Sequence, residues 1–286
     1  MTYGGIEAGG TKWVCAIGGG PHALADAVTI PTTTPAQTID VAAAFFTQHG
    51  GLDALGIGSF GPVDLERGFI TTTPKPGWAN TDVVGALRSA LDVPIAFDTD
   101  VNAAALGEHT VGAAIGLETF CYITVGTGIG GGGMANGRLM HGLLHPELGH
   151  MRIPHDKERD PFAGACPYHG DCFEGLASGG ALRARWGRPP DEVDDEPTWE
   201  LEADYLAHGL LNVIAVLSPQ RVIVGGGVLK RSNLLPLVRT RVAGLAAGYF
   251  DAPELSTSID DYVVPPALGD RAGVIGALEL ARLAAA

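Results

Sequence analysis

The sequence predicts an α/β protein in two lobes, because short apolar runs that end in glycine clusters alternate with amphipathic segments of helical length. Two of these clusters, Gly9–Gly10 and Gly126–Gly130, each follow a strand-like run, and they open similar units about 120 residues apart. With 286 residues, the chain is long enough for two domains that each bury a core. These observations together favour a duplicated architecture.

Strands are expected where Val, Ile and Tyr gather in short runs bounded by glycine. The first is Met1 to Ala8, and Trp13 to Ile17 follows so closely that Gly9–Gly10 is predicted to form a hairpin turn between them. The remaining predicted strands are Ala54–Ser59, Pro94–Phe97, Phe120–Val125 and Arg221–Val224.

Helices are expected where apolar residues recur with helical periodicity. The predicted helices are Ile39–His49, Thr81–Leu91, Asn102–Val111, Glu174–Trp186, Thr198–Leu217 and Gly273–Ala286. We expect Met134–Pro167 to be rich in loops, and the acidic stretch Pro189–Pro197 to be a solvated loop.

The charge balance argues against some classes of function. The chain has 18 Lys and Arg against 32 Asp and Glu, a formal net charge of −14, so its composition does not indicate binding to nucleic acid or to an anionic membrane. No apolar run approaches the roughly 18 residues that a membrane span needs, and Glu7 and Lys12 interrupt the region where a secretory signal would be apolar. We therefore expect a cytoplasmic protein.

Two glycine motifs resemble nucleotide-binding signatures but lack the context that these signatures require. Gly5 to Lys12 is similar to a P-loop, yet its last two residues are in reversed order and a strand follows in place of the helix. Gly126, Gly128 and Gly131 have the spacing of a dinucleotide-binding turn, yet the residues after them do not favour a helix. Neither motif predicts its usual fold.

Hairpin turns are the better interpretation of these two clusters. Their backbone N–H groups, together with the hydroxyls of Thr11 and Thr127, can donate hydrogen bonds to phosphate oxygens from two sides. Such an arrangement suits a nucleoside triphosphate. The alternative for any single cluster, including Gly225–Gly227, is an ordinary tight turn.

A pair of carboxylates marks a candidate catalytic site. Asp98 to Asn102 lies at a predicted strand-to-helix junction, where a carboxylate can cap the helix or accept a proton. A general base for phosphoryl transfer must reach the attacking hydroxyl, and Asp100 is our candidate for that role. Capping is the alternative, and we expect it of one of the two carboxylates.

Several polar side chains are candidates for binding a sugar. Glu147 and His150 lie in a glycine-bearing loop and carry groups that can bind vicinal hydroxyls. Asn80, Asn102 and Glu174 add further polar groups from separate loops.

Cysteine and histidine form one dense cluster. Cys166, His169 and Cys172 follow one another at intervals of three residues, and four such ligands suit a closed, structural zinc site. We expect His155 to be the fourth ligand, with His141 and His145 as alternatives. A chance cluster of buried thiols is the other interpretation. The chain has 4 cysteines, too few for a disulfide scaffold.

Taken together, these motifs resemble the ROK family of sugar kinases, and within it the bacterial fructokinases, over nearly the whole chain. Each glycine turn alone is weakly specific, whereas the set is highly specific. The segments that carry the resemblance are Gly5–Lys12, Gly58–Pro62, Thr73–Trp78, Asp98–Asn102, Gly126–Gly130, Glu147–His150, Cys166–Glu174 and Gly225–Gly227.

The resemblance implies an actin- and hexokinase-like (ribonuclease H-like) fold, with two α/β lobes around an interlobe cleft. Residues 1–115 and 265–286 would form the first lobe and residues 116–264 the second. Asp100 would take the proton from the C6 hydroxyl of fructose as that hydroxyl attacks the γ-phosphate of Mg-ATP. A structural zinc and a homodimer are also implied.

The resemblance also assigns binding residues. The phosphates would be held by Glu7, Gly9, Gly10, Thr11, Lys12, Gly126, Thr127, Gly128 and Gly130, and the adenosine by Gly225, Gly226 and Gly227. The sugar would be held by Gly61, Asn80, Asn102, Glu147, His150 and Glu174.

Two features depart from the broader family pattern and look like the fructokinase branch. Glu7 stands where most members have Asp, so its contact with magnesium could run through water, and Cys166-x-x-His169-x-x-Cys172 replaces a cysteine-only cluster.

The alternative activities are phosphorylation of glucose or mannose, and a non-catalytic role as a sugar-responsive regulator. We expect no regulator, because the phosphate turn begins by Glu7 and leaves no room for a helix-turn-helix.

Overall fold

The computed structural model describes residues 1–286, and the chain divides into two compact units. Unit 1 contains Met1–Gly116, Leu139–His145 and Ala267–Ala286, and unit 2 contains Leu117–Arg138 and Pro146–Pro266. The expected lobes, 1–115 with 265–286 and 116–264, differ from these units mainly at Leu139–His145. That segment packs with unit 1, although unit 2 precedes and follows it along the chain.

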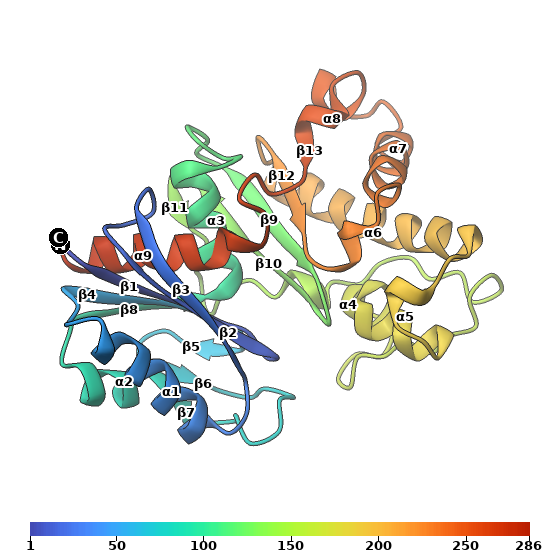
Figure 1. The fold of residues 1–286 in the computed structure, drawn as a ribbon. Helices are drawn as coiled ribbons and strands as arrows, with labels where there is room; N and C mark the ends of the chain where they lie inside the picture. Colours follow the sequence, from blue (N-terminus) through green and yellow to red (C-terminus); the bar gives the residue numbers. More distant parts are fainter. The chain divides into compact units, whose positions relative to one another are not determined.

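Each unit is built on a five-stranded sheet (Figure 1). The strands of unit 1 are β1 (Tyr3–Ala8), β2 (Lys12–Gly18), β3 (Leu24–Pro31), β4 (Ala54–Ser59) and β8 (Ile95–Thr99). Those of the second sheet are β9 (Phe120–Val125), β10 (Ile129–Ala135), β11 (Arg138–Leu139), β12 (Val222–Gly225) and β13 (Val263–Val264).

The two sheets have the same strand order. In unit 1 it is β3-β2-β1-β4-β8, where β1 is antiparallel to β2 and parallel to β4, and β4 is parallel to β8. In unit 2 it is β11-β10-β9-β12-β13, where β9 is antiparallel to β10 and parallel to β12, and β12 is parallel to β13. The duplication predicted from the glycine clusters is therefore present.

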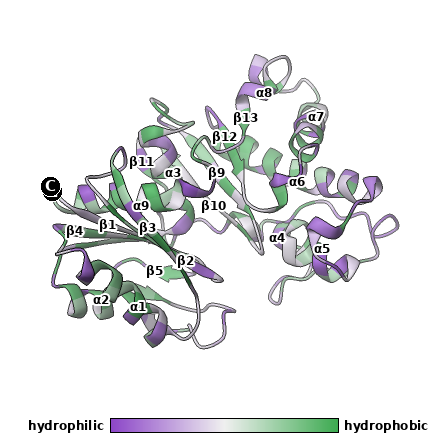
Figure 2. Cartoon of the chain, viewed as in Figure 1, coloured by the Kyte–Doolittle hydropathy of each residue, from purple (hydrophilic) through white to green (hydrophobic).

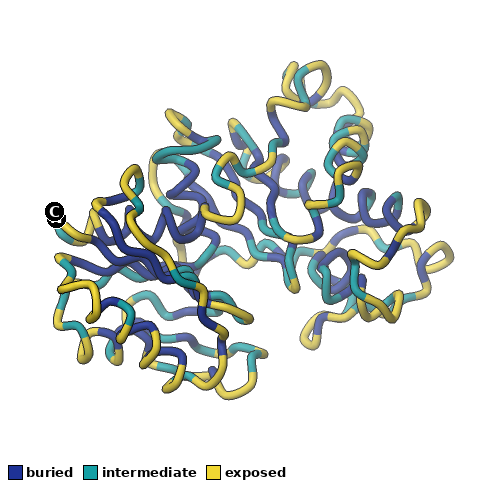
Figure 3. The backbone as a smooth tube through the Cα atoms, viewed as in Figure 1, coloured by how far each residue is buried: buried dark blue, intermediate teal, exposed yellow.

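Because side chains alternate along a strand, successive residues of β1 face opposite sides of the sheet. Ile6 and Ala8 pack with helices α1 (Pro35–Gln48) and α2 (Val83–Leu91), whereas Tyr3 packs with α9 (Ala272–Ala284). Gly5 also faces α9, since a Cβ there would lie 2.9 Å from the backbone nitrogen of Leu278. The strands between the helices are largely buried (Figure 3), and the hydrophobic colour follows them and much of α9 (Figure 2).

Helix α3 (Asp100–Val111) packs directly on α9 through glycines. A Cβ at Gly276 would lie 1.6 Å from the carbonyl oxygen of Ala103, and one at Gly107 would lie 2.5 Å from that of Ala272. Glycine is required at both positions because the two backbones touch. Since α3 begins directly after β8, this contact fixes the start of α3 on the sheet.

In unit 2, α6 (Glu196–Leu217) packs against both α4 (Phe173–Ala177) and α7 (Leu234–Ala246). Cys121, Ile123 and Val125 of β9 alternate along the strand and belong to the same apolar cluster as these helices. The core of unit 2 therefore lies between the β9 face of the sheet and α6.

Some elements differ from the predictions. The single helix expected over Glu174–Trp186 is wrong, because α4 ends and α5 (Gly179–Trp186) begins on either side of Ser178. Ser178 has an extended backbone, with ψ 160°, and its hydroxyl caps α5 by accepting the N–H of Ala181. The elements that were not predicted include α7, β10 and β3, an edge strand whose residues are mostly exposed.

Shorter elements complete the units. In unit 1, β5 (Val63–Asp64), β6 (Phe69–Ile70) and β7 (Thr81–Asp82) form a small sheet, so the helix predicted from Thr81 begins at Val83. Unit 2 contains the short α8 (Ile259–Tyr262). The 3₁₀ helices are Leu148–His150, Pro190–Glu192, Val228–Lys230, Pro253–Leu255 and Gly269–Arg271. None of the helices combines the length and the apolar character that a bilayer span requires.

The contact between α3 and α9 generates a stability prediction. Gly276→Ala should lower the free energy of unfolding of the protein by about 3 kcal/mol, because the new methyl group must push the two helices apart. Thermal unfolding should show a lower Tm. Gly244→Ala in α7 is the matched control: its Cβ would meet nothing within 4 Å, so it should stabilise the helix by about 0.5–1 kcal/mol. Equal Tm values for the two variants would contradict the contact.

Candidate active site

The first glycine turn joins β1 to β2, as predicted, and its carbonyl groups are held by the protein. The N–H of Gly9 donates to the carbonyl oxygen of Lys12 over 3.0 Å and closes the hairpin. Thr32 donates its hydroxyl to Gly9 over 2.7 Å and its N–H to Thr11 over 3.0 Å. A Cβ at Gly10 would face open space. The N–H groups of a glycine turn and the ammonium group of Lys12 are both of a kind that binds phosphate oxygens.

Glu7 lies near the end of β1 and points to the α9 face of the sheet. Its carboxylate accepts the N–H of Val274 and would clash with a Cβ at Gly273, in the first turn of α9. The Oε2 atom is buried and has no hydrogen-bond partner. Burial raises the pKa of Glu7 to about 7, against a lowering by Lys12 and by the Val274 hydrogen bond. A buried, unpartnered carboxylate oxygen is a suitable ligand for a divalent cation.

The second glycine turn joins β9 to β10, and two helices hold it. The first N–H groups of α5 donate to the carbonyl oxygen of Gly126 over 2.8 Å and to that of Thr127 over 3.0 Å. Glu174 in the first turn of α4 accepts the N–H of Ile129 over 2.9 Å through its Oε2. A Cβ at Gly128 would lie 2.5 Å from that same oxygen. Glu174 thus sets the geometry of the turn.

The third glycine cluster, Gly225–Gly227, lies beside the second turn. Gly226 has φ 98°, and a Cβ there would lie 2.4 Å from the carbonyl oxygen of Val125. Gly130, in contrast, lies inside β10 and pairs with Thr124. Because β9 and β12 are parallel, both clusters lie at the carboxyl ends of strands, the edge where α/β sheets bind their ligands.

The junction between β8 and α3 carries the candidate base. Thr99 caps α3, since its hydroxyl accepts the N–H of Asn102 over 3.1 Å. Asp98 is buried and accepts the N–H of Thr99 over 2.7 Å and the side-chain amide of Asn102 over 3.0 Å. Asp100 is half-buried, and its Oδ1 accepts the N–H of Val101 over 2.9 Å. Of the two carboxylates, Asp100 is therefore the more exposed.

The expected sugar contacts divide equally between the units, with Gly61, Asn80 and Asn102 in unit 1, and Glu147, His150 and Glu174 in unit 2. Asn80 is exposed and has a left-handed backbone, with φ 55°. Asn102 differs from the others because its exposed fraction is 0%, and its amide group also donates to the carbonyl oxygen of Met140 over 3.3 Å. The structure thus places the Asn102 side chain in a network of protein hydrogen bonds.

A metal centre can form in unit 2 from His150, Cys166, His169 and Cys172, whose ligand atoms all lie within 4.8 Å of one another. Tetrahedral zinc requires about 3.3 Å between two nitrogen ligands and about 3.6 Å between nitrogen and sulfur. The Nδ1 atoms of His150 and His169 are 3.3 Å apart. Sγ of Cys166 lies 3.8 Å from Nδ1 of His150 and 3.7 Å from that of His169, and Sγ of Cys172 lies 3.7 Å from Nδ1 of His150. The residues therefore fit zinc.

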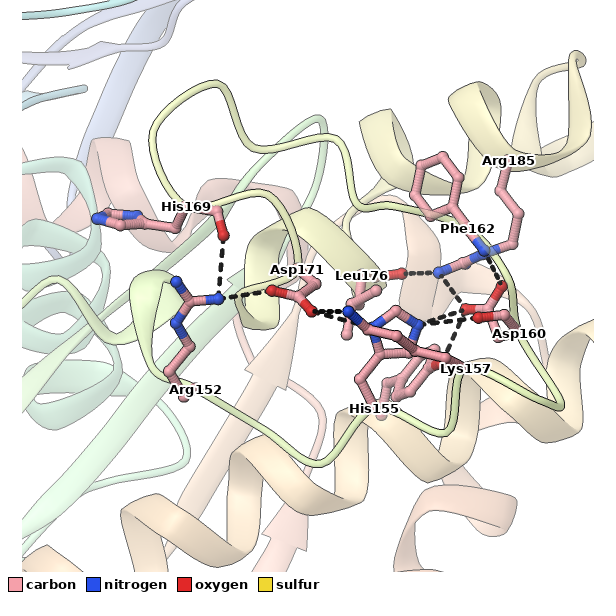
Figure 4. A network of polar contacts seen from close by, with 10 residues as sticks. Arg152, His155, Lys157, Asp160, Phe162, His169, Asp171, Leu176 and Arg185 are labelled. Carbon is pink, nitrogen blue, oxygen red and sulfur yellow. Dashed lines mark hydrogen bonds and ion pairs between the residues drawn. The ribbon is translucent and has the colours of Figure 1, made fainter.

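His155, expected as the fourth ligand, lies outside this cluster. Its Nδ1 is 3.1 Å from Asp171 Oδ2, and its Nε2 is 3.0 Å from the carbonyl oxygen of Asp160. Figure 4 shows this network, in which Arg152 also contacts Asp171 over 2.6 Å and the carbonyl oxygen of His169 over 3.0 Å. Both ring nitrogens of His155 are thus engaged. His150 takes its place in the ligand set, a correction to the sequence-based expectation.

The two alternatives for the fourth ligand lie in unit 1. His145 is buried, and its Nε2 accepts the N–H of Val63 over 3.1 Å, beside Gly61. His141 pairs with Asp98 over 2.9 Å. His150 could not be singled out from the sequence because it is 16 residues from Cys166, a separation without any local ligand pattern.

The buried carboxylate of Glu7 predicts a pH dependence of stability in the metal-free, nucleotide-free protein. With a folded pKa of about 7 against an ordinary value of 4.5, Glu7 keeps a proton that the unfolded chain releases. Stability should therefore fall as pH rises between these two values, by on the order of 3 kcal/mol. Thermal unfolding at about pH 5 and about pH 8 should show a larger loss of Tm in the wild type than in Glu7→Gln. Equal losses of Tm in the wild type and in Glu7→Gln would contradict the burial of the Glu7 carboxyl group.

Both the sequence and the fold match known proteins over almost the whole chain. The model of the ROK family matches residues 3–284. Fructokinases from Zymomonas mobilis and Pediococcus pentosaceus are 44% and 42% identical, in matches that cover 98% and 99% of this chain and 96% and 99% of theirs. The crystal structure of a ROK hexokinase from Thermus thermophilus is similar with a TM-score of 0.81 and 29% identity, covering 99% of this chain and 98% of that one.

Proposed function

Since the chain belongs to the ROK family and has the actin- and hexokinase-like fold of ROK hexokinases, we propose that it is an ATP-dependent fructokinase. The products would be ADP and fructose 6-phosphate. The observation that carries this proposal is the full-length similarity to fructokinases, at 42% and 44% identity, against 29% for the hexokinase.

Asp100 is the proposed general base. As the C6 oxygen of fructose bonds to the γ-phosphorus, the bond from that phosphorus to the β–γ bridging oxygen breaks, and the hydroxyl proton passes to the Asp100 carboxylate. The position of Asp100 supports this role: it is half-buried in the first turn of α3, where the helix N-terminus favours a negative charge.

The three glycine clusters are the proposed ATP site. Gly9 to Lys12 and Gly126 to Gly130 would bind the phosphates, and Gly225 to Gly227 would lie against the adenosine. Magnesium, when bound, offsets the charge of the transferred phosphoryl group. Glu7 would hold it, directly or through water, because its buried Oε2 has no protein partner.

We propose that Gly61, Asn80, Glu147, His150 and Glu174 contact the sugar. Asn102 is fully buried, so it would act on sugar binding only through the residues that it contacts. Nδ1 of His150 would bind zinc, so the proton of the ring would lie on Nε2, which can donate to a sugar oxygen. Glu174 already holds the second turn through Oε2, and its Oε1 would accept a sugar hydroxyl. His150 would thus link the sugar to the zinc site, and Glu174 would link it to the glycine turn proposed to bind phosphates.

The zinc is proposed to be structural, because four protein ligands leave no open position. From the resemblance to bacterial fructokinases, we also propose that the protein acts in the cytoplasm as a homodimer.

The alternative function is a kinase of broader hexose specificity, which the similarity to a ROK hexokinase supports. A coupled assay of ADP release with ATP and fructose, glucose or mannose distinguishes the two. The highest kcat/KM is expected for fructose. A higher value for glucose or mannose would replace the fructokinase assignment with the alternative.

Asp100→Asn keeps the shape of the side chain but removes its basicity. It should lower kcat by at least about 100-fold, while the affinity for fructose, measured by calorimetry, stays within about threefold. Near-normal turnover in this variant would mean that another group acts as the base.

The proposed zinc site predicts different effects for substitutions of His150, a proposed ligand, and His155, which lies outside the ligand set. His150→Gln should purify with little zinc and a lower Tm, whereas His155→Gln should retain about one zinc per chain, because only His150 contributes a ligand. Elemental analysis of the two folded variants measures this directly. Zinc retained in His150→Gln but lost in His155→Gln would restore the ligand set expected from the sequence.

A further inference from the structure

A histidine that the proposed mechanism does not use lies beside the candidate base. His141, in the Leu139–His145 segment of unit 1, places its Nε2 2.9 Å from Oδ2 of Asp98. The side chain of Asp98 is 5% exposed and that of His141 is 40% exposed. His141 is therefore the outer member of an ion pair whose inner member lies two residues before Asp100.

The hydrogen bonds of Asp98 fix which atoms donate. Its Oδ1 accepts the N–H of Thr99 over 2.7 Å and the amide of Asn102 over 3.0 Å, and His141 is the partner of Oδ2. A carboxylate can only accept, so Nε2 of His141 carries the proton in this pair. In agreement, the pKa of His141 is raised above its ordinary value, chiefly by its hydrogen bond with Asp98.

These contacts lie on both sides of Asp100, the proposed base, along the chain. Asp98 holds Thr99, directly before Asp100, and Asn102, two residues after it. Thr99 in turn caps α3 through the N–H of Asn102. One buried carboxylate thus contacts both the cap of α3 and a residue of its first turn. Without a donor on Oδ2, that carboxylate would keep a buried, unsatisfied oxygen and would gain by rotating toward solvent.

We propose that His141 is a positioning residue for phosphoryl transfer: through Asp98 and Asn102 it holds the first turn of α3 so that Asp100 meets the substrate hydroxyl. The proposal rests on the proposed role of Asp100 as the base. Loss of the donor leaves a buried oxygen of Asp98 unsatisfied, which lowers stability modestly, and a small displacement of a base costs rate. The loss of His141 should therefore lower kcat, with KM nearly unchanged and a modest fall in Tm.

Two substitutions of His141 make a matched test, because they differ by one methylene. The amide nitrogen of Gln reaches the position of Nε2, whereas that of Asn reaches only as far as Nδ1. His141→Asn should lower kcat by about tenfold and Tm by about 2–4 °C, with KM for fructose and for ATP within about twofold of wild type. His141→Gln should keep kcat within about threefold of wild type.

His49 provides a control of the same chemistry elsewhere in unit 1. Its Nε2 lies 3.1 Å from Asp26 Oδ2, an ion pair between β3 and the residue that follows α1, away from the junction at Asp100. His49→Asn should leave kcat unchanged. A similar loss of kcat in His49→Asn and His141→Asn would overturn the proposal.

A double-mutant cycle separates this proposal from the role of Asp100. If His141 acts through the base, His141→Asn has no further effect on the residual kcat of Asp100→Asn. A full tenfold effect in that background, an unchanged kcat in the single His141→Asn variant, or no rescue by Gln would overturn the positioning role while leaving the base assignment intact. Near-normal turnover of Asp100→Asn alone would instead overturn the base, and the proposal with it.

Discussion

The backbone contact between α3 and α9 is the constraint on which unit 1 depends. Gly107 and Gly276 let the two helices touch, and α9 in turn lies over β1, where its first turn meets Glu7. Because β1, β4 and β8 are parallel, the glycine turn after β1 and the Asp98–Asp100 junction after β8 lie at the same edge of the sheet. The phosphate-binding groups and the base proposed for this unit thus depend on one packed pair of helices.

Unit 2 repeats the sheet but adds different chemistry to its edge. The loop from Cys166 to Cys172 leads directly into α4, whose first turn carries Glu174 against the second glycine turn. His150 joins this loop through its Nδ1 atom. One short segment therefore connects the metal ligands, a candidate sugar contact and the turn proposed to bind phosphate. This is the physical reason to expect that a structural metal influences sugar binding.

Local patterns predicted the features that depend on neighbouring residues in sequence. The hairpin at Gly9–Gly10, the strand Ala54–Ser59 and three of the four metal-site residues belong to this group. What could not be predicted depends on contacts distant in sequence. Ser178 ends a helix because α5 turns its first N–H groups to Gly126 and Thr127. His150 and His141 reach partners 16 and 43 residues away, so spacing carries no signal for either.

Asp100, as the group that removes the proton from the sugar, is the centre of the proposed phosphoryl transfer. A crystal structure with fructose and a non-hydrolysable ATP analogue tests this most directly. We predict a carboxylate oxygen of Asp100 at about 3 Å from the C6 oxygen, with that oxygen in line with the γ-phosphorus. A complex in which Asp100 is directed away and another side chain holds the C6 hydroxyl would contradict the mechanism.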